Sequence, residues 1–435
     1  MSKFEKDGFL LIYDSVRVDL TKYEPISSDL LNFMDRLEAG ELVNDSENRA
    51  VGHYWLRDWT RAPSNDVAND ILEEIHKVAT FFRSNDFSYL IYIGIGGSGL
   101  GPNLIYDCFS HRTRKKVIVI DNIDQEGIAR KLSGVSLADT LVCVASKSGT
   151  TTETIVAKEI VKNLFGKMSL SFENHAIAIT MQNTPLWKEA DNWLSRFKLW
   201  DWVGGRTSIH GAVGLSVMDF MELNSNLFLE GAKFMDNLTR QTEVHQNPAL
   251  IVCFALVDCF ARGKKNLCVL PYSDRLELFS KYLQQLFMES LGKTREDGSL
   301  FGLTVFGNKG TTDQHSFVQQ LRQGNDDFIA VFIRRLYPEI TIDDSVLNHP
   351  IEKYFDSFLL GTREALTAAG REHLTLTVPR LDEFWLGALI ALFERVVGFF
   401  ARYYRINAYN QPGVEEGKWS SKKYLQLEEN LKNIP

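Results

Sequence analysis

Residues 90–99 read Leu-Ile-Tyr-Ile-Gly-Ile-Gly-Gly-Ser-Gly, an apolar run that passes directly into a glycine-rich loop. A short run of β-branched and aromatic side chains bounded by glycines is typical of a strand buried on both faces of a parallel sheet. Glycines let the backbone approach an anion, and the N–H groups that begin the next helix favour negative charge. This stretch therefore predicts an α/β fold with an anion-binding loop at the end of a buried strand.

Similar apolar runs recur along the chain, with helix-length segments between them. The first half repeats the run at 117–120, 141–144 and 176–179, and the second half has runs at 267–270, 303–306 and 328–332. Strands that alternate with helices indicate parallel sheets, so we expect two α/β domains, each a parallel sheet flanked by helices. The predicted boundaries are a helical N-terminal arm at 1–60, a first domain at 61–223, a helical linker at 224–248, a second domain at 249–405 and a C-terminal arm at 406–435.

The amino-acid composition limits the classes of protein to which this chain can belong. The 435 residues exceed what one hydrophobic core usually supports, which agrees with two domains. Hydrophobic residues at 44% and charged residues at 24% are typical of a soluble globular protein. The formal charge of -8 argues against a protein that wraps nucleic acid or lies on an anionic membrane. An anionic ligand must therefore be held by local backbone dipoles and a few placed cations.

The cysteines and the N-terminus indicate a cytoplasmic protein. The chain has five cysteines, an odd number without a Cys-x-x-Cys pair, and most lie in apolar patterns typical of core thiols. That usage suits a reducing compartment, and the first residues lack the apolar run of a signal peptide. The most apolar stretch, 384–393, is interrupted by Glu394 and Arg395, and it predicts a buried core helix rather than a membrane span.

The glycine loop by itself leaves three interpretations open. Gly94, Gly96 and Gly99 satisfy the dinucleotide fingerprint G-x-G-x-x-G, and Asp121 follows the next strand, near where a ribose-binding acid would lie. The pattern fits a nicotinamide-dependent dehydrogenase, a phosphate-binding loop, or a tight turn without a ligand.

A second polar loop follows the strand at 141–144. Residues 146–153 read Ser-Lys-Ser-Gly-Thr-Thr-Thr-Glu and place five hydroxyl side chains in one turn. Glu153 behind capping hydroxyls indicates a helix start, and hydroxyls with helix N–H groups form a compact cage for a terminal phosphate. A plain helix cap needs one hydroxyl, and a dinucleotide site has no use for a second cage. We therefore interpret this turn as a phosphate site.

Candidate chemical groups lie farther along the chain. The stretch 276–290 has helical period, and Gln285 and Glu289 lie one above the other at the edge of its apolar stripe. Partial burial moves the pKa of a carboxyl towards the range of a general base, although a lone helical glutamate is usually solvated. Arg206 follows two glycines and suits a developing oxyanion. His315 lies in a polar turn, where a single histidine is more often structural, and no metal-ligand pattern is present, so no metal is expected.

Six motifs, in this order, resemble those of the phosphoglucose isomerase family, and the resemblance runs from about residue 50 to 420. The motifs are Gly-Ile-Gly-Gly-Ser at 94–98, Ser-Lys-Ser-Gly-Thr-Thr at 146–151, Gly-Gly-Arg-Thr-Ser at 204–208, Gln-Gln-x-x-Met-Glu-Ser-x-Gly-Lys at 284–293, Gln-His at 314–315 and Gln-Pro-Gly-Val-Glu-x-Gly-Lys at 411–418. The resemblance implies two sugar-isomerase domains and the isomerisation of glucose 6-phosphate and fructose 6-phosphate, a step of glycolysis and gluconeogenesis, without a cofactor. It also implies a homodimer with shared active sites.

The resemblance implies a role for each matching residue. Glu289 is the base that moves a proton between the first and second sugar carbons, and Arg206 stabilises the enediolate. His315 and Lys418 assist ring opening. The implied substrate-binding residues are Gly97, Ser98, Ser146, Lys147, Ser148, Thr151, Gln285 and Gln411, with the phosphate on Ser146, Lys147, Ser148 and Thr151.

Three departures from the family pattern are visible, and none removes a catalytic group. Leu291 stands where many members have Asn, Asn410 stands where Asp is common, and Ser148-Gly149 replaces the Thr-Phe of many animal members but resembles bacterial ones. Two other interpretations stay open. One is a non-catalytic or differently specific sugar-phosphate-binding protein with the same domains, which has no need of Glu289 and Arg206. The other is a dehydrogenase.

Overall fold

The computed structural model describes residues 2–44, 46–414, 416–417, 419–421, 423–424 and 426, and it contains two main sheets. The first has five parallel strands in the order β4-β3-β5-β6-β7. They are β3 (Tyr89–Gly94), β4 (Lys116–Ile120), β5 (Thr140–Ala145), β6 (Ala176–Met181) and β7 (Ser195–Leu199). The four predicted runs of this half form β3 to β6. The prediction omits β7 because polar Ser195, Arg196 and Lys198 alternate with its two apolar residues.

The second sheet has six strands in the order β1-β2-β13-β12-β8-β11, of which the last four are parallel. They are β1 (Lys3–Lys6), β2 (Phe9–Ile12), β8 (Asn266–Tyr272), β11 (Thr304–Phe306), β12 (Phe328–Arg335) and β13 (His373–Val378). The three runs predicted in this half form β8, β11 and β12. A small hairpin of β9 (Lys293–Thr294) and β10 (Leu300–Phe301) lies outside both sheets.

The N-terminal segment differs from our expectation of helices alone. Strands β1 and β2 form a hairpin, and β2 pairs antiparallel with β13. Phe9 and Leu11 are fully buried, so the hairpin covers the edge of the second sheet with apolar side chains. Helix α1 (Glu24–Glu38) follows it.

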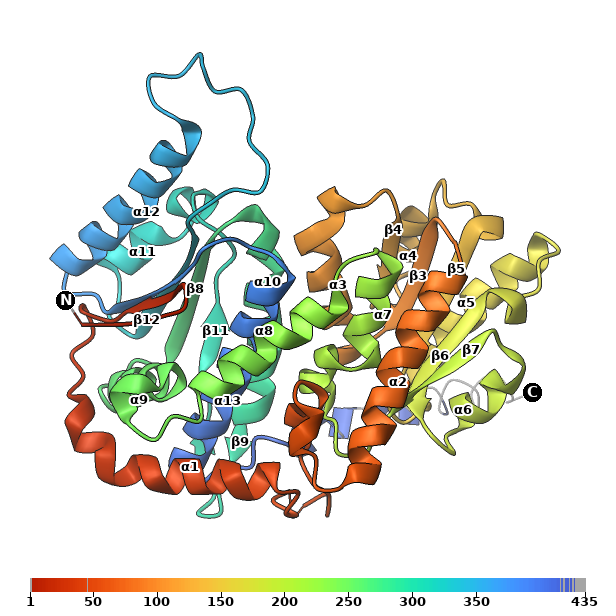
Figure 1. The fold of residues 1–435 in the computed structure, drawn as a ribbon, viewed down its shortest axis with the longest axis horizontal. Helices are drawn as coiled ribbons and strands as arrows, with labels where there is room; N and C mark the ends of the chain where they lie inside the picture. The colour runs from red at the N-terminus through yellow and green to blue at the C-terminus, as the bar shows by residue number, and fades with distance from the viewer. Residues whose placement is uncertain are drawn as a thin grey trace.

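Helices surround both sheets, and Figure 1 shows the second sheet at the left and the first at the right. Helix α10 from the second half packs against α3 from the first half, so the two halves meet beside the glycine loop. The helices of the first half are α2 (Asn65–Ser84), α3 (Gly97–Phe109), α4 (Gln125–Leu132), α5 (Thr152–Lys167), α6 (Pro185–Glu189) and α7 (Ala212–Phe220). Those of the second half are α8 (Ser225–Leu238), α9 (Pro248–Ala261), α10 (Glu277–Gln284), α11 (Val318–Gln323), α12 (Ile351–Ala368) and α13 (Glu383–Tyr403).

Helix α13 is the core helix predicted from the apolar stretch. By length and composition it could cross a membrane, but 94% of its apolar window is buried inside the protein, where it packs against α8 and α9. All five cysteines are buried and unpaired, which confirms them as core thiols. Helix α8 lies within the predicted linker. The domain boundaries themselves stay predictions.

Candidate active site

Two loops leave the first sheet side by side, because β3 and β5 are neighbouring parallel strands. Gly94 pairs with Ala145 in register, so loops 95–96 and 146–151 start at the same edge. Helices α3 and α5 begin directly after these loops, and neither N-cap residue accepts a hydrogen bond through its side chain. Both helix N-termini therefore present N–H groups near one edge of the sheet, which is the arrangement an anion site needs.

The glycine loop supports a second segment of backbone. A Cβ atom on Gly97 would lie 2.1 Å from the carbonyl oxygen of Gly205 and 2.8 Å from the nitrogen of Arg206. Only glycine permits so close an approach. The carboxylate of Asp121, the candidate ribose ligand, accepts a hydrogen bond from Lys131 Nζ at 2.8 Å. Gly97, which is not one of the fingerprint glycines, thus serves close backbone packing against Gly205 and Arg206. Among the fingerprint glycines, a Cβ atom on Gly94 would lie 2.4 Å from Ser98 O and one on Gly99 would lie 2.2 Å from Gly94 O, so these two glycines close the turn itself.

The predicted phosphate cage forms a tight turn before α5. Ser146 Oγ lies 3.0 Å from Thr151 Oγ1, and Thr150 Oγ1 donates to Ser148 Oγ at 2.9 Å. Gly149 has φ +65°, and a Cβ atom there would lie 2.9 Å from Leu186 Cβ, so the turn requires glycine. Ser148 and Thr150 are exposed, which leaves their hydroxyls accessible to a ligand.

Lys147 directs its ammonium group away from the cage. Lys147 Nζ donates to the carbonyl oxygens of Asp201 and Val203 at 2.6 and 2.8 Å. Burial lowers the pKa of this lysine to about 8, and the nearby charge of Arg49 adds to the effect. The side chain therefore ties the cage to the turn that precedes Arg206.

Gln285 and Glu289 come together as predicted, although on a different kind of helix. Helix α10 passes into a π-helical turn at Gln285–Glu289, a feature often found at functional sites. Gln285 Nε2 donates to Glu289 Oε2 at 2.8 Å, and a Cβ atom on Gly96 would lie 3.2 Å from the same Nε2. The amide of Gln285 thus joins the carboxylate to the glycine loop. The Glu289 side chain is 25% exposed, so it is partly buried but open to a ligand.

Arg206 faces Glu289 and is held from behind by main-chain oxygens. Its Nη1 lies 3.2 Å from Glu289 Oε1, and its Nη2 donates to Ala408 O at 2.8 Å and Asn410 O at 3.1 Å. Gln411 Oε1 accepts from Nη1 at 3.3 Å. Burial lowers the pKa of the guanidinium and Glu289 opposes this shift, but arginine stays charged at neutral pH. The structure thus brings Arg206, Gln285, Glu289 and Gln411 together.

Sequence reasoning did not single out Lys293, which contacts the main chain of Glu289. Lys293 Nζ donates to the main-chain oxygen of Glu289. Burial lowers its pKa to about 8, and the charge of Arg206 also lowers it. The four-residue spacing from Glu289 was the available signal, since residues four apart lie on one side of a helix.

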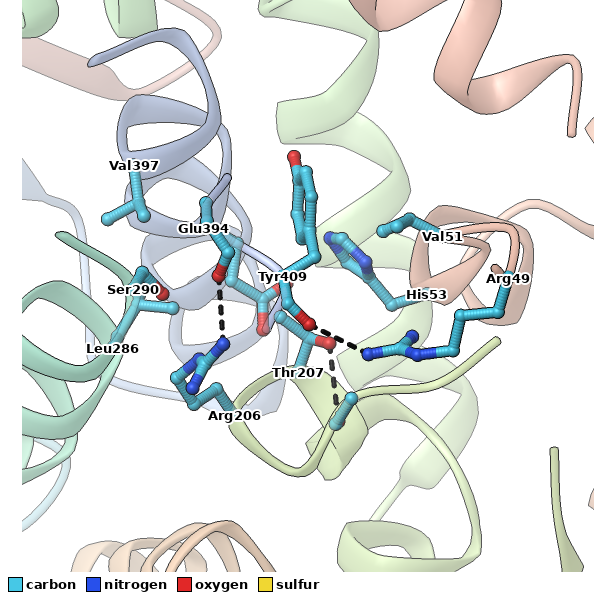
Figure 2. A pocket seen from close by; sticks show the side chains of 12 residues that line it. Arg49, Val51, His53, Arg206, Thr207, Leu286, Ser290, Glu394, Val397 and Tyr409 are labelled. Atoms are coloured by element: carbon cyan, nitrogen blue, oxygen red, sulfur yellow. Dashed lines mark hydrogen bonds between the residues drawn. The ribbon is translucent and has the colours of Figure 1, made fainter. Parts of the chain in front are cut away.

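His53, Glu394 and Tyr409 form a group of side chains behind Arg206, which we call the buried wall. Sequence reasoning missed it as well. Figure 2 shows the side chains of Arg206, His53, Glu394 and Tyr409 around a small cavity. Its volume is about 20 Å³, too small to hold a sugar phosphate. Tyr282 reaches this wall, where its single hydroxyl proton is shared between two acceptors, Glu394 Oε1 and the main-chain oxygen of Arg206.

The structure does not join His315 to the other predicted catalytic residues. His315 is exposed in the turn at 312–315, and no contact joins it to Glu289 or Arg206 in the described part of the chain. Lys418 lies outside the described residues. Within the described residues, no cluster of three or more His, Cys, Asp or Glu side chains is arranged to hold a metal ion.

The arrangement can transfer a proton and stabilise an anion. An accessible carboxylate can accept a proton, the guanidinium 3.2 Å away can stabilise negative charge, and Gln285 can fix the orientation of the carboxylate. A phosphate held at the two loops would place the rest of a small substrate towards these groups.

Known proteins resemble this chain over most of its length. Residues 15–350 match the family model described as phosphoglucose isomerase. The glucose-6-phosphate isomerase of Prochlorococcus marinus is 43% identical over 427 residues, which cover 93% of this chain and 81% of the relative. That of Desulfitobacterium hafniense is 42% identical, with 95% of this chain and 81% of the relative covered. The crystal structure of a glucose-6-phosphate isomerase from Chlamydia trachomatis matches with a TM-score of 0.91 and 28% identity, covering 100% of this chain and 91% of that one.

Proposed function

The chain belongs to the phosphoglucose isomerase family, and from this premise we infer that it interconverts glucose 6-phosphate and fructose 6-phosphate. One observation in the site supports this function above the others. The Glu289 carboxylate is held between Gln285 and Arg206, beside two loops suited to a phosphate. A protein that only sensed sugar phosphates would need the loops but not this group, so the non-catalytic alternative is not favoured.

We propose that Glu289 is the base of the reaction. An aldose–ketose shift requires one base placed over two adjacent carbons, which removes a proton from one carbon and returns it to the other. The bond from Gln285 fixes the carboxylate while one oxygen still faces Arg206. Arg206 then meets the negative charge that develops on the enediolate oxygens. No redox cofactor is required, because the substrate as a whole is neither oxidised nor reduced.

We assign the phosphate group of the substrate to the loops at 95–96 and 146–151. Ser146, Ser148 and Thr151 supply hydroxyls, Ser98 lies in the first turn of α3, and Gly97 allows the loops and Arg206 to approach one another. Lys147 belongs to this cage by position, although its ammonium group is bound to carbonyls of the neighbouring turn. Gln285 and Gln411 are assigned to the sugar hydroxyls. The hydroxyls and helix N-termini suit a dianionic group.

The assignment of His315 depends on a homodimer, which we propose from the family resemblance. His315 is exposed and does not contact the Glu289 of its own chain, which agrees with service in the site of a partner subunit. His315 and Lys418 assist ring opening. We further propose a cytoplasmic enzyme, because its five buried thiols suit a reducing compartment, with no nucleic acid or membrane as partner.

The function is tested by adding glucose 6-phosphate to the purified chain in the presence of a chelator and without NAD. We expect fructose 6-phosphate to form, detected by NMR spectroscopy. Binding of the sugar phosphate without turnover would indicate a sensor. Turnover that appears only when NAD is added would indicate a dehydrogenase.

A further inference from the structure

Tyr282 connects the stretch Gly205–His210, which we call the Arg206 segment, to the buried core of the molecule. Its hydroxyl oxygen lies 3.1 Å from the main-chain oxygen of Arg206 and 3.0 Å from Glu394 Oε1. The Tyr282 side chain is buried, and burial raises the pKa of its hydroxyl, so the group remains a protonated donor. Tyr282 comes from α10, one turn before Gln285, whereas Glu394 comes from α13.

The Arg206 segment needs such an anchor because regular structure does not hold it. Arg206 follows two glycines in a short helical stretch, Gly205–His210, that is interrupted by non-helical torsion angles at Thr207. Its side chain is fixed by carbonyl oxygens of residues 408 and 410. Tyr282 acts on the other end of the same residue, at the main-chain oxygen.

Glu394, the second partner of the Tyr282 hydroxyl, is held firmly in the core. Glu394 is almost fully buried, and its second carboxylate oxygen pairs with Arg57, which also pairs with Asp236 at 3.0 Å. A buried carboxylate paired in this way resists displacement, because moving it would leave an uncompensated charge. Removing the Tyr282 hydroxyl would leave the carbonyl of Arg206 and this carboxylate facing each other as two acceptors without a donor, and the Arg206 turn would shift away.

We propose that Tyr282 is a positioning residue for the isomerase reaction, holding Arg206 at the distance from Glu289 that the transition state requires. The inference rests on the proposed function and adds a residue that does not touch substrate. A displacement of about 1 Å in a catalytic group can cost about 100-fold in rate, so loss of this anchor is measurable.

The test is a double-mutant cycle between Tyr282→Phe and Arg206→Ala. We expect Tyr282→Phe to lower kcat about tenfold with KM changed less than twofold, and to have less than a twofold effect in the Arg206→Ala background, because it acts through that side chain. Tyr23→Phe is a matched control, since Tyr23 is also buried and donates to a carboxylate, Asp258, at 2.9 Å, away from the site. That variant should keep the wild-type kcat.

The kinetics of Tyr282→Phe decide whether Tyr282 positions Arg206. A folded Tyr282→Phe protein with kcat within twofold of wild type, or an equal loss in both backgrounds, would overturn the inference. If Tyr282→Phe does not fold, Glu394→Gln weakens the same contact and also the buried pair with Arg57, so its fold is first checked by circular dichroism, and the same split between kcat and KM is then required of it. A wild-type chain without isomerase activity would instead reject the proposed function, so the two failures are distinguishable.

Discussion

Arg206 and Glu289 place a positive and a negative charge 3.2 Å apart in a largely buried site. Because the enediolate charge develops in the transition state, Arg206→Ala should lower kcat by about 100-fold while KM changes much less. Steady-state kinetics measure both constants. Arg334→Ala is the control, since Arg334 pairs with Asp356 in the second half of the chain, and its kcat should match wild type. A rise in KM alone would instead place Arg206 at the phosphate.

The site residues found from sequence are those that lie within motifs. Gln285 and Glu289 could be paired because they are four apart, and the hydroxyls of 146–151 occur in one turn. The contact that joins Arg206 to Tyr282, and Tyr282 to Glu394, could not be found from motifs. Tyr282 and Glu394 are 112 residues apart in sequence, and only the packing of α10 against α13 brings them together. Glu394 was noted only because its charge interrupts an apolar run.

At the scale of elements, the predicted strands are those with continuous apolar runs. Strands β3 to β6 are such runs, because helices cover both faces of the sheet. Strand β13 was missed, since its buried side chains include His373, Thr375 and Thr377. The β1–β2 hairpin was missed although Asp7-Gly8, both with positive φ, form the two-residue turn that indicates a hairpin. Only the pairing of β2 with β13, about 360 positions away, has no local signal.

The contact between the glycine loop and the Arg206 turn leads to a test by substitution. A methyl group on Gly97 would lie 2.1 Å from Gly205 O, so Gly97→Ala should separate the two segments and reduce kcat at least tenfold, or prevent folding. Gly166→Ala is the matched control in α5, because an added Cβ meets no atom within 4 Å. It should be neutral or stabilising by about 0.5–1 kcal/mol. Full activity of Gly97→Ala would show that the contact is not required.

Helix α7 carries a carboxyl group that makes stability depend on pH. Burial raises the pKa of Asp219 to about 6. The folded state therefore binds this proton more tightly than the unfolded state, and stability is lost as the pH rises from the usual aspartate pKa of about 4 through about 6, above which the loss is complete. Asp219→Asn removes the ionisation, so we expect the free energy of unfolding to rise by about 1–3 kcal/mol at pH 8 and by little at pH 4.

Denaturant titrations at the two pH values measure this difference for Asp219→Asn. Asp35→Asn, on the exposed side of α1, is the control and should show no comparable gain. An equal gain from Asp219→Asn at pH 4 and pH 8 would contradict ionisation as the cause.

At the scale of the whole molecule, the homodimer proposed from the family resemblance, in which His315 serves the Glu289 of the partner subunit, predicts that activity can be restored between subunits. Glu289→Gln and His315→Ala are each expected to be inactive. A heterodimer of the two has one site with both lesions and one site with an intact Glu289 and an intact His315. Refolding the two variants together should recover at most about a quarter of the wild-type activity for random pairing. Activity that stays at the level of the separate variants, despite proven heterodimers, would place both residues on one chain.

In the proposed reaction, Glu289 transfers a proton between the first two carbons of a hexose phosphate. The most direct measurement follows glucose 6-phosphate in D₂O by NMR spectroscopy, with the wild-type chain and with Glu289→Gln. A carboxyl group that holds the proton can exchange it with solvent, so we predict that the wild-type chain forms fructose 6-phosphate with deuterium at its first carbon. The Glu289→Gln chain should still bind phosphate but lose about 10²–10⁴-fold in rate, together with the deuterium incorporation. Near-normal turnover and exchange in that variant would contradict this role of Glu289.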